Sequence, residues 1–230
     1  MASEKARLVP PTRDVFLEIE ELKAQLDQLK ASVKPAKKIG NPAVVGLAGF
    51  GLTTMVLQYH NIGWMENVAP VVYLGLIFGG LAQLCAGLQE YGTGNNFGYC
   101  AFTTYGSFWI ALALMLIGKK TKLYDFDHET LGWFLVAFTC YTIVMTVAAA
   151  AIHMALFIVF FLLSLGFLLL DIGHFGPPVA NKIAGWVLLF DALGAWYCML
   201  HVLYNDAYGY NVLPVGPSPV ALIKKAMGRS

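Results

Sequence analysis

Uncharged polar side chains interrupt the long apolar runs in the first half of this sequence. They have few charged neighbours, because residues 39–118 contain no Lys or Arg and only two carboxylates, Glu66 and Glu90. Polar groups inside an apolar segment are costly to bury and usually serve a function. Hydroxyls and amides in such positions can replace water around a small dissolved ion. The candidates for this role are Asn41, Thr53, Thr54, Gln83, Thr103 and Thr104.

The tripeptide Asn41-Pro42-Ala43 opens the first apolar run. Pro in the first turn of a helix costs no hydrogen bond, and Asn just before it can cap the helix. The free N–H groups and positive dipole end of such a helix attract anions. The residues alone leave two interpretations open: an anion-binding helix end at membrane depth, or a simple cap at the cytoplasmic surface. Aquaporin-type channels use this tripeptide twice, and its single occurrence here argues against that class.

Glu90 is the most suggestive carboxylate, because it closes the second apolar run beside a Gly-rich loop. It could relay protons together with a transported solute. It could instead cap the following helix through Asn95, Asn96 or nearby backbone N–H groups. The sequence leaves both roles open.

Enzymatic chemistry has little support in the sequence. There is no GxGxxG, no GxxxxGK[ST], no serine nucleophile elbow and no HExxH. Asp171 and His174 lie three residues apart at the end of an apolar run, where a capping or interfacial role is expected. We therefore expect no enzyme, no catalytic residues, no metal and no cofactor. The histidines are spread over different runs and loops, at His60, His128, His153, His174 and His201.

Composition places the chain among integral membrane proteins. Hydrophobic residues make up 58% of it and charged residues only 13%, too few to cover a water-soluble surface. Residues 131–223 contain four formal charges: Asp171, Lys182, Asp191 and Asp206. The apolar runs are continuous rather than alternating, which indicates membrane-spanning helices of about 20 residues.

Six spans are predicted. Their approximate ranges are 44–58, 69–88, 97–118, 131–149, 152–170 and 183–203. An even number places both termini on one side, and the basic residues that flank the spans favour the cytoplasm for both ends. These residues are Lys30, Lys34, Lys37, Lys38, Lys224, Lys225 and Arg229, whereas Lys119, Lys120, Lys122 and Lys182 fall on the other side. We expect a multi-pass protein of the cell (plasma or inner) membrane without a cleavable signal peptide.

Residues 1–38 form a separate N-terminal arm in this interpretation, followed by a transmembrane domain (39–204) and a tail (205–230). Apolar residues of the arm recur at alternating steps of four and three, which is the spacing of a coiled-coil seam. Self-association and an amphipathic helix lying on the membrane or on the protein's own cytoplasmic face both fit this pattern. The seam residues are Val15, Ile19, Leu22, Leu26, Leu29 and Val33.

Several short motifs together resemble the acetate uptake transporter family, the succinate-acetate permeases. The similarity begins with Asn-Pro-Ala-x-x-Gly-Leu at 41–47 and covers roughly residues 41–216. Its most specific block runs from Gly79 to Trp109. Within and beside that block the matching segments are 49–51, 53–54, 60–61, 79–83, 86–88, 90–91, 94–95, 97–98, 101–103 and 105–109.

This resemblance implies a six-helix protomer that assembles as a ring-like hexamer, each protomer with its own pore for small monocarboxylates. It also implies a hydrophobic constriction midway along the pore, formed by Phe50, Tyr105 and Leu163. The family pattern has Pro-Leu where this chain has Val44-Val45. The start of the first span, and with it the substrate preference, can therefore differ from that of the relatives.

The resulting hypothesis is a transporter or channel for acetate and related small carboxylates, succinate included. Passive conduction, anion–proton symport and diffusion of the neutral acid all remain open. Two alternatives are a membrane scaffold or sensor that uses the arm to recruit a partner, and a channel for a small neutral solute such as urea or ammonia. The expected partners are the carboxylate, the lipid bilayer and further copies of the chain in a homo-hexamer; nucleic acid is not expected.

Overall fold

The computed structural model describes residues 13–32 and 40–228, and in these residues every regular element is a helix. The chain divides into two units, one that contains α1 (Arg13–Ser32) and one that begins at Asn41. Each unit is described by itself.

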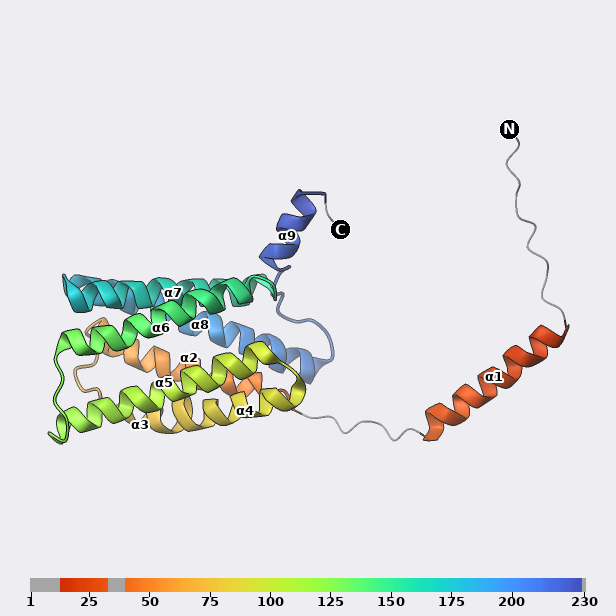
Figure 1. The fold of residues 1–230 in the computed structure, drawn as a ribbon, viewed down its shortest axis with the longest axis horizontal. Coiled ribbons are helices and arrows are strands. Elements are labelled where there is room, and N and C mark those ends of the chain that lie inside the picture. The colour runs from red at the N-terminus through yellow and green to blue at the C-terminus, as the bar shows by residue number, and fades with distance from the viewer. Residues whose placement is uncertain (1–12, 33–39, 229–230) are drawn as a thin grey trace. The chain divides into compact units, whose positions relative to one another are not determined.

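The second unit contains six helices that are long and apolar enough to cross a membrane, as the sequence predicts. Figure 1 shows them running along one another as a bundle. A short amphipathic helix, α9 (Pro219–Ala226), follows the bundle. The six spans are α2 (Ala43–Asn61), the segment Ala69–Thr93, α5 (Asn96–Lys120), α6 (His128–Ala149), α7 (Met154–Phe175) and α8 (Val179–Tyr208).

The second span contains a wide turn. It consists of α3 (Ala69–Leu76), the π-helix η1 (Ile77–Ala82) and α4 (Gln83–Thr93). Two buried glycines allow the wide turn: a Cβ on Gly80 would lie 2.1 Å from the Gly75 carbonyl oxygen, and one on Gly79 would lie 2.4 Å from the Thr53 hydroxyl. Such π-turns are frequent at functional sites, because they change which side chains face inward. Here the turn ends directly before Gln83.

Polar side chains fix the starts of three spans. Asn95, Asp127 and His153 each accept a hydrogen bond from the backbone N–H three residues later, which satisfies an N–H that a helix start leaves free. In the first span Asn41 performs the predicted capping role, because its Oδ1 accepts the N–H of Ala43 at 2.9 Å.

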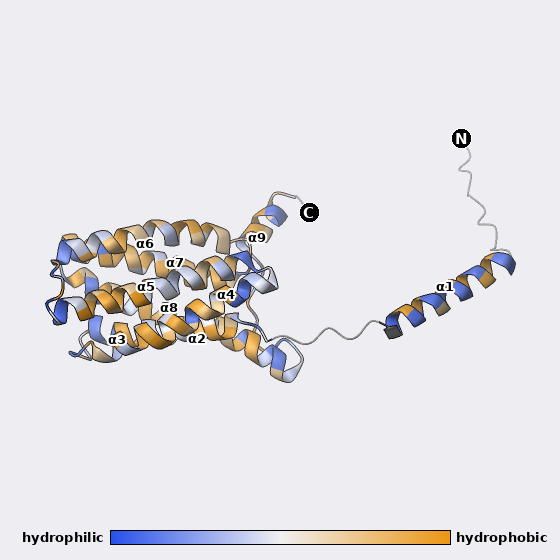
Figure 2. Cartoon of the chain, turned by 60° about the horizontal axis from the view of Figure 1, so that its bottom comes forward, coloured by the Kyte–Doolittle hydropathy of each residue, from blue (hydrophilic) through white to orange (hydrophobic). Residues whose placement is uncertain are grey.

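Helix packing forms a mainly apolar core that also buries polar side chains, Gln58, Gln83 and Asp191 among them. The helix α8 packs along α2 and α7, α7 also packs along α6, and α4 packs along α5. Figure 2 shows hydrophobic residues along the spans and hydrophilic ones at the helix ends. The core is rich in aromatic rings, among them Phe50, Tyr105, Phe108, Trp109, Phe160 and Phe167.

Within the described part of the arm, α1 is helical from Arg13 to Ser32. Its apolar seam is solvent-exposed, with 60% of Leu22 and 63% of Leu29 accessible. The last predicted seam residue, Val33, lies outside the described residues. The coiled coil therefore stays a prediction.

Candidate pathway through the helix bundle

Three cavities follow one another along the inside of the bundle. The first vestibule, of about 170 Å³, reaches the end where α2 begins and is lined by Ala43. The second vestibule, of about 330 Å³, reaches the end where α2 finishes and is lined by His60 and Asn61. A central cavity of only about 30 Å³ lies between them. Together they outline a route from one end of the bundle to the other.

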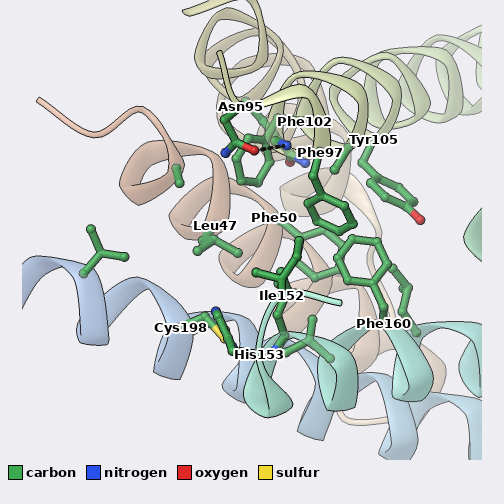
Figure 3. A pocket seen from close by; sticks show the side chains of 18 residues that line it. Leu47, Phe50, Asn95, Phe97, Phe102, Tyr105, Ile152, His153, Phe160 and Cys198 are labelled. Atoms are coloured by element: carbon green, nitrogen blue, oxygen red, sulfur yellow. Dashed lines mark hydrogen bonds between the residues drawn. The ribbon is translucent and has the colours of Figure 1, made fainter. Parts of the chain in front are cut away.

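The residues of the implied constriction separate the first vestibule from the central cavity. Phe50, Tyr105 and Leu163 line both of these cavities and are almost fully buried. The rings of Phe50 and Tyr105 meet edge to face with centroids 6.0 Å apart. Figure 3 shows these rings beside those of Phe97 and Phe160. The central cavity has room for only about one or two water molecules and is the smallest of the three cavities.

Tyr105 contributes its ring, and not its hydroxyl, to the cavity wall. Its oxygen lies 2.8 Å from the hydroxyl of Thr142, which itself donates to the carbonyl of Phe138 at 2.6 Å. The single hydroxyl hydrogen of Thr142 is used there, so Tyr105 is the donor to Thr142. Its hydroxyl therefore points toward α6, and the face of the constriction stays apolar.

Gln83 is the most exceptional polar residue of the first vestibule. Its side chain is fully buried, lines the cavity, and has no hydrogen-bond partner for either amide atom among the described residues. A buried amide without a partner costs about 1–3 kcal/mol. A solute or water in the vestibule can supply the missing partner. Gln83 was predicted as a pathway residue, and the structure places it beside the constriction.

The other predicted hydroxyls of the first span differ in position. Thr54 lines the central cavity. Thr53 is fully buried against the π-turn, and its hydroxyl lies close to Gly79 without a hydrogen-bond partner among the described residues. Asn41 is exposed at the helix start, so only its capping role is visible.

The predicted residues of the following spans lie away from the three cavities. Thr103 donates to the carbonyl of Tyr99 at 2.6 Å, and Thr104 lies beside Tyr141. Glu90 is 2% exposed, and its Oε2 accepts the hydroxyl of Thr93 at 3.1 Å, while its Oε1 has no partner in the described part of the chain. The cap of α5 comes from Asn95 instead.

The sequence did not single out the histidines that line these cavities. His60, His128 and His174 lie up to 114 positions apart in the sequence and form no motif, but folding brings them to the wall of the second vestibule. His153 lines the first vestibule, where its Nδ1 accepts the N–H of Leu156 at 3.1 Å. Burial, and to a smaller extent the nearby His201, lower the pKa of His153. At neutral pH it therefore carries its proton on Nε2.

The walls of the three cavities are uncharged. No Lys, Arg, Asp or Glu is among the described residues that line them. Within residues 13–32 and 40–228, no cluster of His, Cys, Asp or Glu could hold a metal ion. The route offers dipoles, imidazoles and apolar surface to a solute.

Comparison with known proteins identifies the family. The sequence signature of the GPR1/FUN34/yaaH family matches residues 24–220. The chain belongs to the GPR1/FUN34/yaaH family. One relative, the succinate-acetate/proton symporter SatP of Escherichia coli (strain K12), is 39% identical over 183 residues, which cover 79% of this chain and 97% of the relative.

Other members of the GPR1/FUN34/yaaH family agree with this assignment. Acetate permease A of Emericella nidulans is 34% identical over 209 residues, covering 80% of this chain and 68% of the permease. The structure of the bacterial acetate channel SatP superposes with a TM-score of 0.76 at 39% identity, covering 78% of this chain and all of that one. These relatives are named as a symporter, a permease and a channel. The chain is therefore a multi-pass membrane protein of a transporter family with the predicted all-helical fold.

Proposed function

We propose that this protein carries acetate and related small carboxylates across a membrane through the route formed by the three cavities. One observation carries this proposal: Gln83, whose buried amide has no hydrogen-bond partner among the described residues, lines the first vestibule together with the constriction residues Phe50 and Tyr105. The names of the relatives supply the substrate class, including succinate.

A carboxylate and its methyl group find different partners along this route. The carboxylate accepts hydrogen bonds from the amide of Gln83, from the Nε2–H of His153 and from the amide of Asn95, whose Oδ1 is occupied by the N–H of Gly98. The methyl group passes the rings at the constriction. Without a fixed cation the pore binds its solute weakly, which favours rapid release.

Proton coupling belongs to this proposal as well, because a relative is named as a proton symporter. Glu90 has a buried carboxyl, and one of its oxygens lacks a partner among the described residues. In the sequence it lies shortly before Asn95, which lines the first vestibule. Glu90 does not line the vestibule, but its carboxyl lies against Gly98, which does, and through this neighbour it would exchange protons with the solute. Asn41, Thr53, Thr103 and Thr104 would contribute by shaping the helices around the route.

Orientation and assembly follow from charge and from the resemblance. The start of α2 and the end of α8 lie at the same end of the bundle, and the basic residues Lys224 and Lys225 follow α8. We assign this end, with both termini, to the cytoplasm of the plasma or inner membrane. Each protomer has its own complete route, so a homo-hexamer would contain parallel pores. The exposed seam of α1 would support this assembly through helix pairing.

The decisive experiment compares two glutamines of α4. Vesicles with purified protein should take up labelled acetate faster than empty vesicles at the same pH. Gln83→Leu should lower the apparent acetate affinity about tenfold, which corresponds to one lost hydrogen bond of about 1.4 kcal/mol. Gln89→Leu, on the exposed face of the same helix, should leave uptake unchanged. Uptake no faster than in empty vesicles would reject the proposal.

A further inference from the structure

The second vestibule is lined by three imidazoles that have no role in the function proposed above. They come from three different helices: His60 from the last turn of α2, His128 from the first turn of α6 and His174 from the last turn of α7. The rings of His128 and His174 stack with centroids 4.3 Å apart and planes inclined by 28°. His128 is exposed and the other two are half-buried, so water reaches the cluster.

Backbone carbonyls fix the tautomer of two of these rings. The Nδ1 of His174 lies 2.8 Å from the carbonyl oxygen of Leu170, and the Nδ1 of His60 lies 2.9 Å from that of Met65. A carbonyl can only accept, so both Nδ1 atoms carry hydrogen and donate it. In the neutral ring the remaining Nε2 then presents a lone pair. Among the described residues neither Nε2 has a hydrogen-bond partner.

This arrangement makes the cluster sensitive to protons in a defined way. A carboxylate only accepts hydrogen bonds, so it is repelled by a lone pair on Nε2 and attracted by an N–H⁺ at the same place. Histidine is the side chain that changes its charge between pH 5 and 8. The first vestibule differs, because His153 uses its Nδ1 as an acceptor and so keeps an N–H on Nε2 when neutral.

We propose that His60, His128 and His174 form a proton-dependent binding site for small carboxylate anions at the mouth of the second vestibule. Binding of one anion requires that one imidazole takes a proton from solvent onto its free nitrogen. The close stacking of His128 on His174 disfavours a second proton, because two cationic rings at this distance repel each other. Each anion therefore enters with about one proton. This inference rests on the proposed function and adds the residues that couple it to pH.

The remaining charged groups near the cluster complete its electrostatics. On α7, Asp171 interacts with His174 and accepts the hydroxyl of Thr139 at 2.7 Å. At the start of α6, Asp127 accepts the N–H of Thr130 at 2.7 Å, and hydrogen bonds from the Thr130 side chain and backbone lower its pKa. The other charged residues at this end are Glu66 after α2, Lys119 and Lys120 on α5, Lys122 and Asp125 after α5, Glu129 on α6 and Lys182 on α8.

None of these charged groups lines the second vestibule. Lys182, the only cation on α8, is exposed and lies next to Asn181, the residue of that helix that lines the cavity. Lys119 is held by the carbonyl of Phe126 at 2.9 Å. The cavity wall itself contains no other titratable side chain among the described residues.

The test measures acetate binding and proton uptake by the full-length protein in detergent. Labelled acetate is titrated between pH 6 and pH 8, and a pH indicator in weak buffer reports the protons taken up. The wild type should take up about one proton for each acetate bound, and its apparent affinity should fall about tenfold for each pH unit above the histidine range. Acetate binding without proton uptake would overturn the inference.

Glutamine variants separate this site from uptake of the neutral acid. The triple variant H60Q/H128Q/H174Q carries amides that donate at every pH, so its acetate affinity should vary less than about twofold over the same range. The control H201Q changes a histidine that donates to the carbonyl of Leu213 outside the second vestibule, and it should keep the steep profile. A triple variant as steep as the wild type would mean that neutral acetic acid is the species bound.

Two controls keep the outcomes distinct. If the triple variant does not fold, as judged by gel filtration, the three single variants replace it. The proton count is measured on the wild type and needs no variant. Vesicle uptake is measured in parallel. Proton-linked binding without uptake above empty vesicles would reject the proposed function and leave the site standing, whereas uptake with an unchanged pH profile in the variants would reject the site alone.

Discussion

At the scale of single residues, the direction of each hydrogen bond determines what the route offers to a solute. Tyr105 donates to Thr142, so a residue with a polar group contributes an apolar surface. Gln83 has the opposite character, because it lines the first vestibule and its buried amide has no partner among the described residues. The constriction and the polar site beside it thus depend on where hydrogen atoms point.

Tyr105 allows this assignment to be tested. Tyr105→Phe should keep acetate flux within about twofold of the wild type, since it removes only the hydroxyl directed at Thr142, at a stability cost of about 1 kcal/mol. Tyr105→Ala should widen the central cavity, raise the flux of lactate relative to acetate, and cost about 3–5 kcal/mol of stability. Vesicle uptake and thermal unfolding measure both effects. A Tyr105→Phe variant as impaired as Tyr105→Ala would show that the hydroxyl contacts the solute.

At the scale of elements, the π-turn and the helix starts position the pathway residues. The turn η1 ends directly before Gln83, which lines the first vestibule. The start of α7 places His153 at the same cavity. The π-turn changes the hydrogen-bond spacing of the helix, and the His153 side chain satisfies an N–H that a helix start leaves free, so both features are sensitive to small substitutions.

The π-turn predicts a strong effect for one added methyl group. Gly80→Ala would place a Cβ 2.1 Å from the backbone oxygen of Gly75, which should cost about 1–3 kcal/mol through overpacking and reduce acetate uptake. Gly92→Ala, in α4 with no atom within 4 Å of the added carbon, should be neutral or stabilising by up to about 1 kcal/mol. Tryptophan-detected melting in detergent compares the two. Equal melting temperatures would contradict the role of the tight turn.

The start of α7 predicts a specific pH dependence of stability. Because the pKa of His153 is lower in the folded protein than in the unfolded chain, the unfolded chain binds more protons between the two values. The contribution of His153 is therefore complete above the ordinary histidine pKa of about 6.5 and is lost as the pH falls toward the folded value. Protonation also removes the acceptor for the N–H of Leu156.

The measurement is the melting temperature at pH 7.5 and pH 5.5. Loss of one N-cap costs about 1 kcal/mol, equivalent to about 2–4 °C for a chain of this size. His153→Asn keeps a cap that does not titrate, so the melting temperature should fall less on acidification than in the wild type by about that amount. Identical acid shifts in the two proteins would show that His153 is not the titrating group.

At the scale of the whole molecule, the cavities and the arm belong to different units of the chain. Among the described residues, those that line the three cavities run from Ala43 to Val202. The unit that contains α1 is separate from the one that begins at Asn41. Because the arm is a separate unit, its removal can test two hypotheses: a transporter with an accessory arm, and a scaffold whose arm is the functional part.

Deletion of residues 1–34 separates these two classes. The shortened protein should keep the acetate flux per protomer within about twofold of the full chain, because no residue of the route is removed. Its oligomers should dissociate more readily in detergent, because the exposed apolar seam of α1 is lost. Vesicle uptake and gel filtration measure the two properties. Loss of flux in well-folded shortened protein would favour the scaffold or sensor class.

The sequence by itself determined the membrane class, the six spans, the capping role of Asn41 and the family resemblance. These features depend on local composition, helix-start chemistry and contiguous motifs, all of which are present in neighbouring residues. The sequence also singled out Gln83, because an amide inside an apolar run is unusual regardless of how the helix packs.

Only the tertiary structure decided which polar residues meet at a cavity. Thr53, Thr54 and Thr103 look alike in the sequence, yet Thr54 alone of the three lines a cavity, since facing direction depends on helix rotation and on the π-turn. The histidines of the second vestibule lie far apart in the chain, and the packing of α2, α6 and α7 brings them together. Their tautomers depend on backbone carbonyls that become neighbours only after folding, and no local pattern encodes such contacts.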